Sequence, residues 1–309
     1  MSEHRSEAPA PRPSEAEERS SPTERRAVVM AGAPVVEAVL EGVARGVSEL
    51  AADGVTVGLG TILVGDDPAS AGYVRRKHEA CAQVGIASFH QAIPAHAKQQ
   101  DVLDAVACFN DDPGVDAFIV QNPVPAAFDF NEAMEAVDPA KDADGLHPVN
   151  LGRLALDAPG PLPCTPAGIQ AILVHYGVPI EGRHVVIVGR GPTLGRPLSM
   201  LLSLKRPHAN AAVTVVHTGV ADLGAYTREA DIVVGAAGVP GIVGPEMVRP
   251  GAAVVGGGMV YEGRRVLSDV DEAVVEVAGF VTPRIGGVGP TTVAMLLRNT
   301  VAAALRRRR

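Results

Sequence analysis

The sequence predicts an α/β protein in which parallel sheets are covered by helices. Two observations lead to this fold class. Apolar residues recur at helical spacing in segments that alternate with short β-branched runs, as in 34–52 followed by 55–64. Glycine-rich and proline-rich turns separate these segments. Such a rhythm is typical of parallel sheets, and 309 residues are enough for about two domains.

In order along the chain, residues 1–26 mix Pro, Ser, Glu and Arg and predict a disordered tail. The first unit then shows helix 34–52, strand 55–64, helix 70–84, a strand near Phe89, helix 99–109 and strand 116–121. A helix starting near Thr165 opens the second unit, with strands at 185–188, 213–216, 231–234 and 252–255, and a helix near 222–230. The last helix covers 290–305, and the arginines 306–309 predict a solvated, frayed end.

The composition excludes several classes of protein. Three cysteines without a CxxC pair indicate thiols in a reducing compartment, so we expect a cytoplasmic protein. A net charge of -8 offers no basic face for nucleic acid. No apolar run approaches the roughly 20 residues of a membrane span. We therefore expect neither nucleic acid nor membrane among the partners.

A glycine turn between a strand and a helix predicts a cofactor site. Gly189, Gly191 and Gly195 follow strand 185–188 and precede a helical pattern, where backbone N–H groups and the helix dipole can hold a pyrophosphate. The spacing is GxGxxxG, which departs from the strict GxGxxG motif, so a plain tight turn is the alternative.

The next strand ends in His217-Thr218 and lacks the acidic residue that selects NAD. Because Arg190 and Thr218 can reach a 2′-phosphate there, the pattern favours NADP over NAD. The alternative is that Arg190 is a solvated loop residue.

One helix of the first unit carries candidate chemistry. Ser70 is its expected N-cap, and Tyr73 and Lys77 lie one turn apart on one face. Lysine occurs at only four positions, and a partly buried lysine can act as an acid or base near neutral pH. A helix-surface Tyr–Lys pair is the alternative interpretation.

Two loops at carboxyl ends of the predicted sheet can meet that helix. Strand 116–121 ends in Gln121, and Asp144 lies in the Asp-rich turn 141–148. An aspartate in such a turn can instead cap the backbone. We expect no metal site, because His147 has no second ligand at suitable spacing.

Taken together, six segments resemble the bifunctional methylenetetrahydrofolate dehydrogenase/methenyltetrahydrofolate cyclohydrolase family. They occur in the family's order over about residues 27–305. The segments are GDDPASAGYVRRK (65–77), VQNPVP (120–125), KDADGLHPVNLGRL (141–154), PCTPAGI (163–169), GRGPTLGRP (189–197) and TPRIGGVGPTTVAMLL (282–297).

The resemblance implies a folate-binding catalytic α/β domain over 27–164, completed by helix 290–305, and a Rossmann-like NADP-binding domain over 165–289. It implies oxidation of 5,10-methylenetetrahydrofolate by NADP and hydrolysis of the methenyl product to 10-formyltetrahydrofolate. It also implies that the substrates are tetrahydrofolate derivatives and that the chain forms a homodimer.

The resemblance also assigns roles to residues. Lys77 would transfer protons during ring opening, Tyr73 would stack on the folate, Gln121 would bind Lys77, and Asp144 would bind the pterin. Ser70 would lie beside the lysine. Gly286, Gly287 and Pro290 would form the folate-side loop. The cofactor would be lined by Gly189, Arg190, Gly191, Thr193, Gly195, His217 and Thr218.

Three places depart from the family pattern. Gly256-Gly257-Gly258 replaces an aspartate and a small apolar residue before glycine, Arg284 stands in the loop before GGVGP, and Asn122 replaces an aliphatic residue. These changes leave two alternatives open: a specialised paralogue with an impaired dehydrogenase step, or a non-catalytic folate- or nucleotide-binding protein. An unrelated Rossmann dehydrogenase is disfavoured, because it gives no role to Tyr73 and Lys77.

Overall fold

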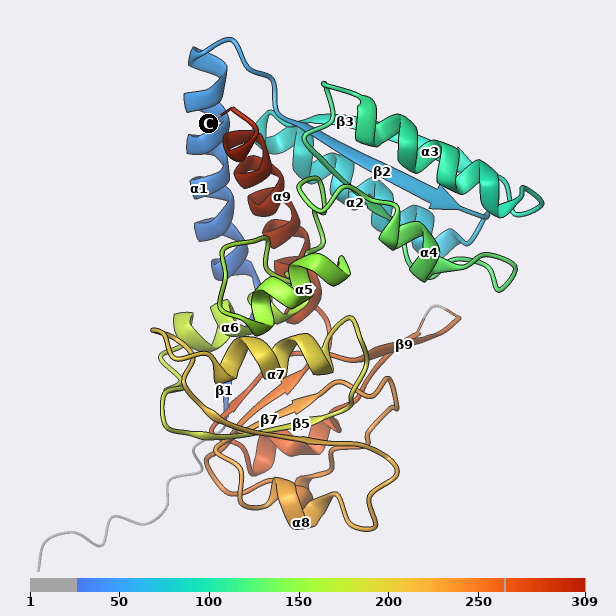
Figure 1. The fold of residues 1–309 in the computed structure, drawn as a ribbon. Helices are drawn as coiled ribbons and strands as arrows, with labels where there is room; N and C mark the ends of the chain where they lie inside the picture. Colours follow the sequence, from blue (N-terminus) through green and yellow to red (C-terminus); the bar gives the residue numbers. More distant parts are fainter. Residues whose placement is uncertain (1–26, 264, 309) are drawn as a thin grey trace, which may run out of the picture.

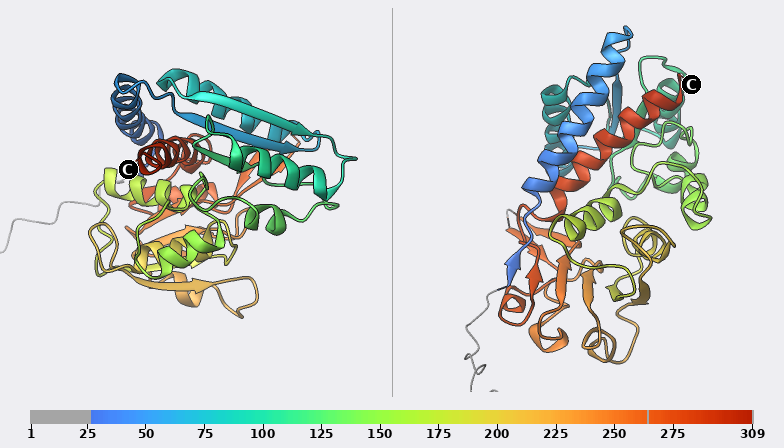
Figure 2. Two further views of the ribbon diagram at one scale, coloured as in Figure 1. Left: turned by 45° about the horizontal axis from the view of Figure 1, so that its top comes forward. Right: turned by 90° about the vertical axis from the view of Figure 1, so that its left-hand side faces the viewer.

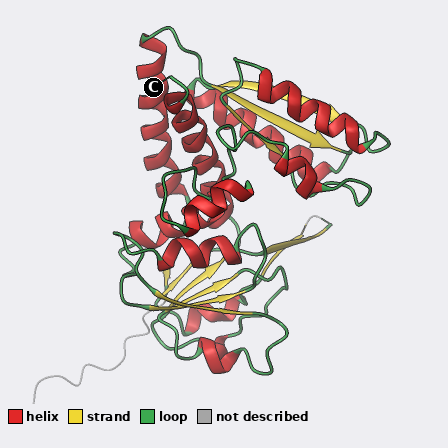
Figure 3. Cartoon of the chain, viewed as in Figure 1, coloured by secondary structure: helices red, strands yellow, loops and turns green. Residues whose placement is uncertain are grey.

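The computed structural model describes residues 27–263 and 265–308, and the tail expected over 1–26 lies outside the described residues. The chain forms two α/β units (Figure 1). One contains a three-stranded sheet of order β3-β2-β4, and the other a six-stranded sheet of order β1-β11-β8-β7-β5-β6. All pairs in both sheets are parallel, and helices flank both sheets (Figure 3). The predicted fold class is confirmed.

The first unit follows the predicted order of elements through β4 and adds two short helices, α4 and α5, that the pattern did not predict. Its helices and strands are α1 (Ala33–Ala52), β2 (Gly58–Val64), α2 (Pro68–Val84), β3 (Ala87–Ile93), α3 (Gln99–Asp111), β4 (Ala117–Val120), α4 (Phe130–Glu135) and α5 (Pro148–Ala155). The central strand β2 is buried along its whole length, which explains its continuous apolar run.

The second unit contains the predicted strands and a hairpin that the pattern did not predict. Its elements are α6 (Cys164–His175), β5 (His184–Val188), α7 (Gly195–Ser203), β6 (Ala212–Val216), α8 (Gly224–Thr227), β7 (Ile232–Gly235), η1 (Pro245–Met247), β8 (Ala253–Gly256), β9 (Met259–Glu262), β10 (Arg265–Ser268), η2 (Glu272–Glu276) and β11 (Phe280–Val281). The antiparallel pair β9–β10 lies outside the main sheet. Helix α8 is shorter than the expected helix near 222–230.

Two terminal elements join the units. Strand β1 (Val28–Val29) pairs in parallel with β11, so the start of the described chain completes the second sheet. Helix α9 (Val288–Arg306) returns from that sheet to lie along α1 (Figure 2). The polypeptide therefore crosses between the units at both ends, in addition to the direct link before α6.

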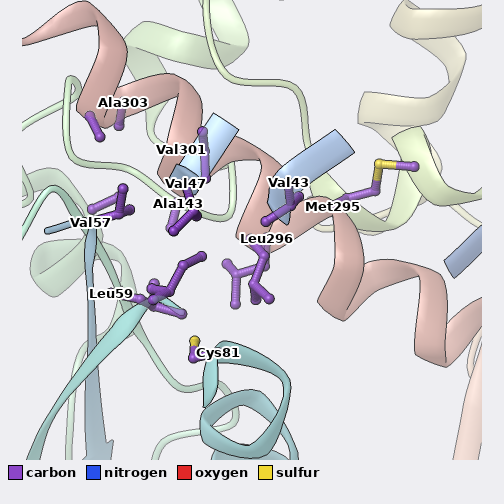
Figure 4. Packing of buried hydrophobic residues seen from close by; sticks show 14 of the residues in the cluster. Val43, Val47, Val57, Leu59, Cys81, Ala143, Met295, Leu296, Val301 and Ala303 are labelled. Carbon is purple, nitrogen blue, oxygen red and sulfur yellow. The ribbon is translucent and has the colours of Figure 1, made fainter. Parts of the chain in front are cut away.

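A hydrophobic core fixes α9 in the first unit. Side chains from α1, β2, α2 and α9 gather in one cluster, shown in Figure 4. The labelled members include Val43, Val47, Leu59, Cys81, Leu296 and Val301. Burying a side chain of this size contributes roughly 1.5–3 kcal/mol. The loop before α9 is in turn tied to the start of α1, because the Gly32 N–H donates to the Gly286 carbonyl oxygen at 2.7 Å.

The arginines at the end of the chain are not a frayed tail, so that prediction is wrong where the structure describes them. Arg307 and Arg308 each pair with the fully buried carboxylate of Asp116, at 3.2 and 2.9 Å. Asp116 also accepts a hydrogen bond from the Gly58 backbone N–H. A buried carboxylate requires such partners, and it draws the terminus onto the sheet. Arg309 lies outside the described residues.

No helix in the described parts of the chain, 27–263 and 265–308, is long and apolar enough to span a membrane.

Candidate active site

Helix α2 carries Tyr73 and Lys77, two of the residues expected in the catalytic site. Asp67 is its N-cap and Pro68 its first residue, an arrangement that suits both side chains. The prediction that Ser70 caps the helix is wrong. Ser70 lies within the first turn, where its backbone N–H and its hydroxyl both donate to Asp67 Oδ2 at 2.8 Å. An aspartate can accept both bonds, so it takes the cap.

Lys77 and Gln121 meet in the buried interior beneath α2. Lys77 Nζ donates a hydrogen bond to Gln121 Oε1 at 2.9 Å, and only 8% of the lysine is exposed. Lys77 is therefore not a surface residue, and the alternative of a helix-surface pair with Tyr73 is wrong. Gln121 follows β4, whose neighbour β2 leads into α2, so the parallel sheet brings the two residues together.

Three charged residues of the Asp-rich turn 141–148 have different roles. Lys141 Nζ donates to the Phe109 and Asp112 carbonyl oxygens, which ties the turn to the end of α3. Asp142 is buried and accepts from the backbone N–H groups of Gly145 and His147 and from Asn150 Nδ2. Asp142 is thus the backbone cap, which leaves Asp144 to face the site.

Burial shifts the pKa values of the ionisable groups in this cluster. It lowers the pKa of Lys77 below its ordinary value, an effect that the nearby Asp144 carboxylate partly opposes. Burial raises the pKa of Asp144, which Lys77 in turn pulls down. It also raises the pKa of the Cys164 thiol well above its ordinary value. A lysine that gives up its proton readily, beside a carboxylate, suits acid–base chemistry.

A cavity of about 760 Å³ adjoins Tyr73 between the two units. It is lined by side chains of α1, α2 and α9, by the β9–β10 hairpin and by the loop 284–287. Gly286, Gly287 and Pro290 line it opposite Tyr73, so the structure brings these four predicted residues together. Lys77, Gln121 and Asp144 lie on the neighbouring side of α2, outside this lining.

The glycine turn after β5 has the shape that a dinucleotide requires. A Cβ on Gly189 (φ 135°) would overlap the Ala236 carbonyl, and one on Gly195 would overlap that of Gly189. Gly191 in contrast faces open space. In the described chain, no hydrogen bond occupies the N–H groups of Thr193 and Gly195 at the start of α7, which can therefore receive a phosphate.

The residues expected to select the cofactor lie at one edge of the sheet. Val188 and Val216 are register partners at the ends of the neighbouring strands β5 and β6. Arg190 lies two residues after Val188 and Thr218 two residues after Val216, so both lie at the same end of the sheet. Both side chains are exposed. His217 is held by a hydrogen bond from the Gly219 N–H to its Nδ1 at 3.0 Å. Two exposed donors without a carboxylate between them can bind a 2′-phosphate.

Comparison with known proteins agrees with this geometry. Residues 30–144 match the sequence model of the tetrahydrofolate dehydrogenase/cyclohydrolase catalytic domain, and residues 163–308 match that of the same family's NAD(P)-binding domain. The chain belongs to the tetrahydrofolate dehydrogenase/cyclohydrolase family. Its sequence is 66% identical over 283 residues to the bifunctional protein FolD of Syntrophotalea carbinolica, covering 92% of this chain and 98% of that protein.

Solved structures of the family have the same fold. The bifunctional FolD enzyme of Campylobacter jejuni superimposes with a TM-score of 0.86 at 36% identity, covering 91% of this chain and 99% of that one. The FolD enzyme of Trypanosoma brucei, complexed with NADP cofactor and inhibitor, gives 0.85 at 36% identity, with 92% and 99% covered.

The triple glycine that departs from the family pattern is closely packed. Its three N–H groups are bonded, that of Gly256 to Thr282 Oγ1 and those of Gly257 and Gly258 to the Gly235 carbonyl. A Cβ on Gly258 would overlap Asp269, whose carboxylate accepts from three backbone N–H groups of residues 237–239. Backbone hydrogen bonds and close contacts therefore fix this run in place.

Sequence reasoning missed three contributors to the site. Arg76 stacks on Tyr73, with its Cζ 4.5 Å from the ring centroid. The two residues are three apart on a helix, a spacing that could have predicted this contact. The β9–β10 hairpin lines the cavity, and Gly263 (φ 60°) was its turn signal. Cys164 lies near Lys77 and Asp144. These residues come from separate segments of the chain, so no local sequence pattern predicts that they lie close together.

The described residues include no group of three side chains suited to a metal ion. His147 caps α5 by accepting a hydrogen bond from the Val149 N–H at 3.0 Å.

Proposed function

We propose that this protein runs both reactions of its family at the cluster around Lys77. It oxidises 5,10-methylenetetrahydrofolate to 5,10-methenyltetrahydrofolate with NADP, and hydrolyses that product to 10-formyltetrahydrofolate. The observation that carries the proposal is the buried pair of Lys77 and Gln121 at 2.9 Å, beside Asp144. The bifunctional relatives, 60–66% identical over most of the chain, support the same pair of reactions.

NADP is the cofactor, as in the complex of the Trypanosoma brucei relative. When bound, it accepts the hydride that leaves the methylene carbon. We assign its pyrophosphate to Gly189, Gly191, Thr193 and Gly195, because the open space at Gly191 and the N–H groups of α7 fit an anion. Arg190, His217 and Thr218 would hold the adenosine end.

Ring opening is the step in which Lys77 acts. Water adds to the methenyl carbon, and the free amine of Lys77 takes a proton as the carbon–oxygen bond forms. The bond from that carbon to N5 then breaks as N5 gains a proton and the new hydroxyl group loses one to form the formyl C=O. One proton, the one taken by Lys77, is released overall. The lowered pKa of Lys77 raises the share of free amine at neutral pH.

The remaining site residues would position the folate. Asp144 can accept hydrogen bonds from the N–H groups of the pterin. Its carboxylate is available because Asp142 accepts the hydrogen bonds from the backbone N–H groups of the turn. Tyr73 offers a ring for stacking. The loop with Gly286 and Gly287, together with Pro290 in the first turn of α9, forms another wall of the cavity. Ser70 would help to hold the first turn of α2 beside them.

Further proposals concern the organisation of the molecule. We assign residues 27–164 with α9 to folate binding and 165–289 to cofactor binding, except for β1, which belongs to the second sheet. We propose a homodimer through the second sheet, where β6 is an edge strand with Val215 37% exposed. Size-exclusion chromatography with light scattering would test it. The three free cysteines support a cytoplasmic location.

The deciding experiment incubates the purified protein with methylenetetrahydrofolate and NADP. We expect NADPH to form together with 10-formyltetrahydrofolate. Formation of neither product by correctly folded protein that binds both ligands would refute the proposal.

A further inference from the structure

The reactions proposed above do not use Asp269, a fully buried residue of the second unit. It follows directly after β10. Its Oδ2 accepts hydrogen bonds from the backbone N–H groups of Ala237 and Gly238, at 2.7 and 3.1 Å, and its Oδ1 accepts one from the Val239 N–H at 2.9 Å. Three consecutive N–H groups of the loop after β7 therefore converge on one side chain.

This carboxylate has no cation beside it. No ion pair within residues 27–263 and 265–308 includes Asp269. Burial raises the pKa of Asp269, and the hydrogen bonds from the three N–H groups oppose this rise. A buried carboxylate needs such donors, and the loop needs an acceptor for its N–H groups. The position of the loop and the position of the carboxylate therefore depend on each other.

Two glycines make room for the Asp269 side chain. A Cβ on Gly235, the last residue of β7, would lie 2.7 Å from the Cβ of Asp269. A Cβ on Gly258, the third glycine of the unusual run, would overlap the Asp269 carboxylate. The Gly258 N–H also donates to the Gly235 carbonyl at 3.0 Å, which brings the two backbone segments together. Any side chain at either glycine would displace the carboxylate from the loop.

The loop that Asp269 holds lies against the glycine turn of the proposed cofactor site. Gly235 and Val188 are register partners at the ends of β7 and β5, so loop 236–239 and turn 189–195 begin at the same end of the sheet. The two also touch, because a Cβ on Gly189 would overlap the Ala236 carbonyl. Dinucleotides bind beyond the carboxyl ends of the strands in sheets of this kind.

The strand order indicates which part of NADP meets this loop. The order is β7-β5-β6, so β5 lies between the other two strands. In the proposed site the pyrophosphate lies at the turn after β5, and His217 and Thr218 hold the adenosine end after β6. The nicotinamide end therefore continues in the opposite direction, across the loop after β7. Gly238 and Val239 of this loop are exposed, so a ligand can contact them.

We infer that Asp269 is a positioning residue for hydride transfer: it fixes loop 236–239, which in turn holds the nicotinamide end of NADP. The inference rests on the proposed function, and it concerns only the first of the two reactions. A displacement of the reacting groups by about 1 Å can slow a reaction about 100-fold, so a loop that shifts slightly has a large effect on the rate. Hydrolysis of the methenyl product takes place at Lys77 and needs no cofactor.

The test variant is Asp269→Asn, which keeps the size of the side chain but replaces one acceptor oxygen by an N–H donor. We expect kcat for NADPH formation from methylenetetrahydrofolate to fall about tenfold. Hydrolysis of methenyltetrahydrofolate, supplied directly and without NADP, should change less than about twofold. Asp271→Asn is the matched control, because Asp271 is exposed and caps η2 through the Ala273 N–H at 2.8 Å. It should keep the wild-type rates of both reactions.

A binding measurement separates positioning from a loss of fold. Adenosine 2′,5′-bisphosphate carries the adenosine end of NADP and lacks the nicotinamide. Its Kd, measured by calorimetry, should differ less than about twofold between Asp269→Asn and the wild type. An equal loss of this binding would mean that Asp269 only holds the second unit together, and would overturn the inference. Unchanged NADPH formation, an equal fall in hydrolysis, or the same fall in Asp271→Asn would also overturn it.

Failure of the proposed function would give a different result. If the wild-type protein forms no NADPH, the proposed function fails, and calorimetry still tests Asp269. The wild type should bind NADP more tightly than adenosine 2′,5′-bisphosphate, and Asp269→Asn should lose this difference. Loss of the difference supports the role of Asp269. Its absence from the wild type, or its survival in the variant, overturns that role.

Discussion

Lys77 Nζ donates to an amide oxygen of Gln121, at 2.9 Å, where most buried lysines would meet a carboxylate. The amide cannot turn over, because Gln121 Nε2 donates to the Asn122 carbonyl at 2.6 Å. The neutral acceptor orients the ammonium without adding a negative charge that would retain its proton. The effect of burial on the pKa of Lys77 is therefore opposed mainly by Asp144.

Replacing this amide by a carboxylate should slow ring opening. In Gln121→Glu the added negative charge favours protonated Lys77, so the pKa of Lys77 rises. Less free amine is then present at neutral pH, and the cyclohydrolase rate should fall about tenfold there. The measurement is the pH profile of methenyltetrahydrofolate hydrolysis. A rising limb that does not move to higher pH would contradict the role of Gln121.

Removing the amine should separate the two reactions. Lys77→Met should abolish hydrolysis while hydride transfer survives in part, because hydride transfer needs no proton acceptor. Lys77→Arg should behave similarly, since a guanidinium keeps its proton at working pH. Both activities are followed by absorbance at matched folate concentrations. Wild-type hydrolysis in either variant would remove Lys77 from the mechanism.

Arg190 should determine the choice between NADP and NAD. Without its guanidinium, Arg190→Ala loses a charge-assisted bond to the 2′-phosphate, and KM for NADP should rise about tenfold with little change for NAD. Arg196→Ala is the control, because Arg196 is an exposed arginine of the neighbouring helix α7. An equal loss of both cofactors in Arg190→Ala would show that Arg190 does not contact that phosphate.

The triple glycine should resist restoration of the family's aspartate. A Cβ at Gly256 would lie 2.6 Å from Ser268 Oγ, so Gly256→Asp should destabilise the protein by about 1–3 kcal/mol. Ser268→Gly removes the obstructing hydroxyl, and the double variant should recover most of the loss in urea unfolding. Equal stabilities of the single and double variants would mean that Ser268 is not the obstacle.

Asp142 should matter for stability and Asp138 should not. Asp142→Ala leaves two backbone donors and the Asn150 amide without their buried acceptor, at a cost of roughly 2–4 kcal/mol. The exposed Asp138 caps one turn N–H, so Asp138→Ala should cost less than about 1 kcal/mol. Thermal unfolding distinguishes the two variants. Similar losses of stability in both would contradict the role of Asp142 as the buried acceptor of the turn.

The sequence alone determined the parallel α/β fold, the glycine turn and the family. These depend on local signals: the apolar period of each segment, the glycine spacing at 189–195 and short motifs that need no knowledge of contacts. The residue types suited to chemistry, Tyr73 and Lys77 among them, were visible for the same reason.

Only the tertiary structure decided how those residues are used. The burial of Lys77 against Gln121 joins segments 44 residues apart, and the capping role of Asp142 depends on where the turn meets α5. The pairing of Arg307 and Arg308 with Asp116 spans more than half the chain. Such partners are chosen by packing and by the need to satisfy buried charge, which act across the folded chain and leave no trace in a local pattern.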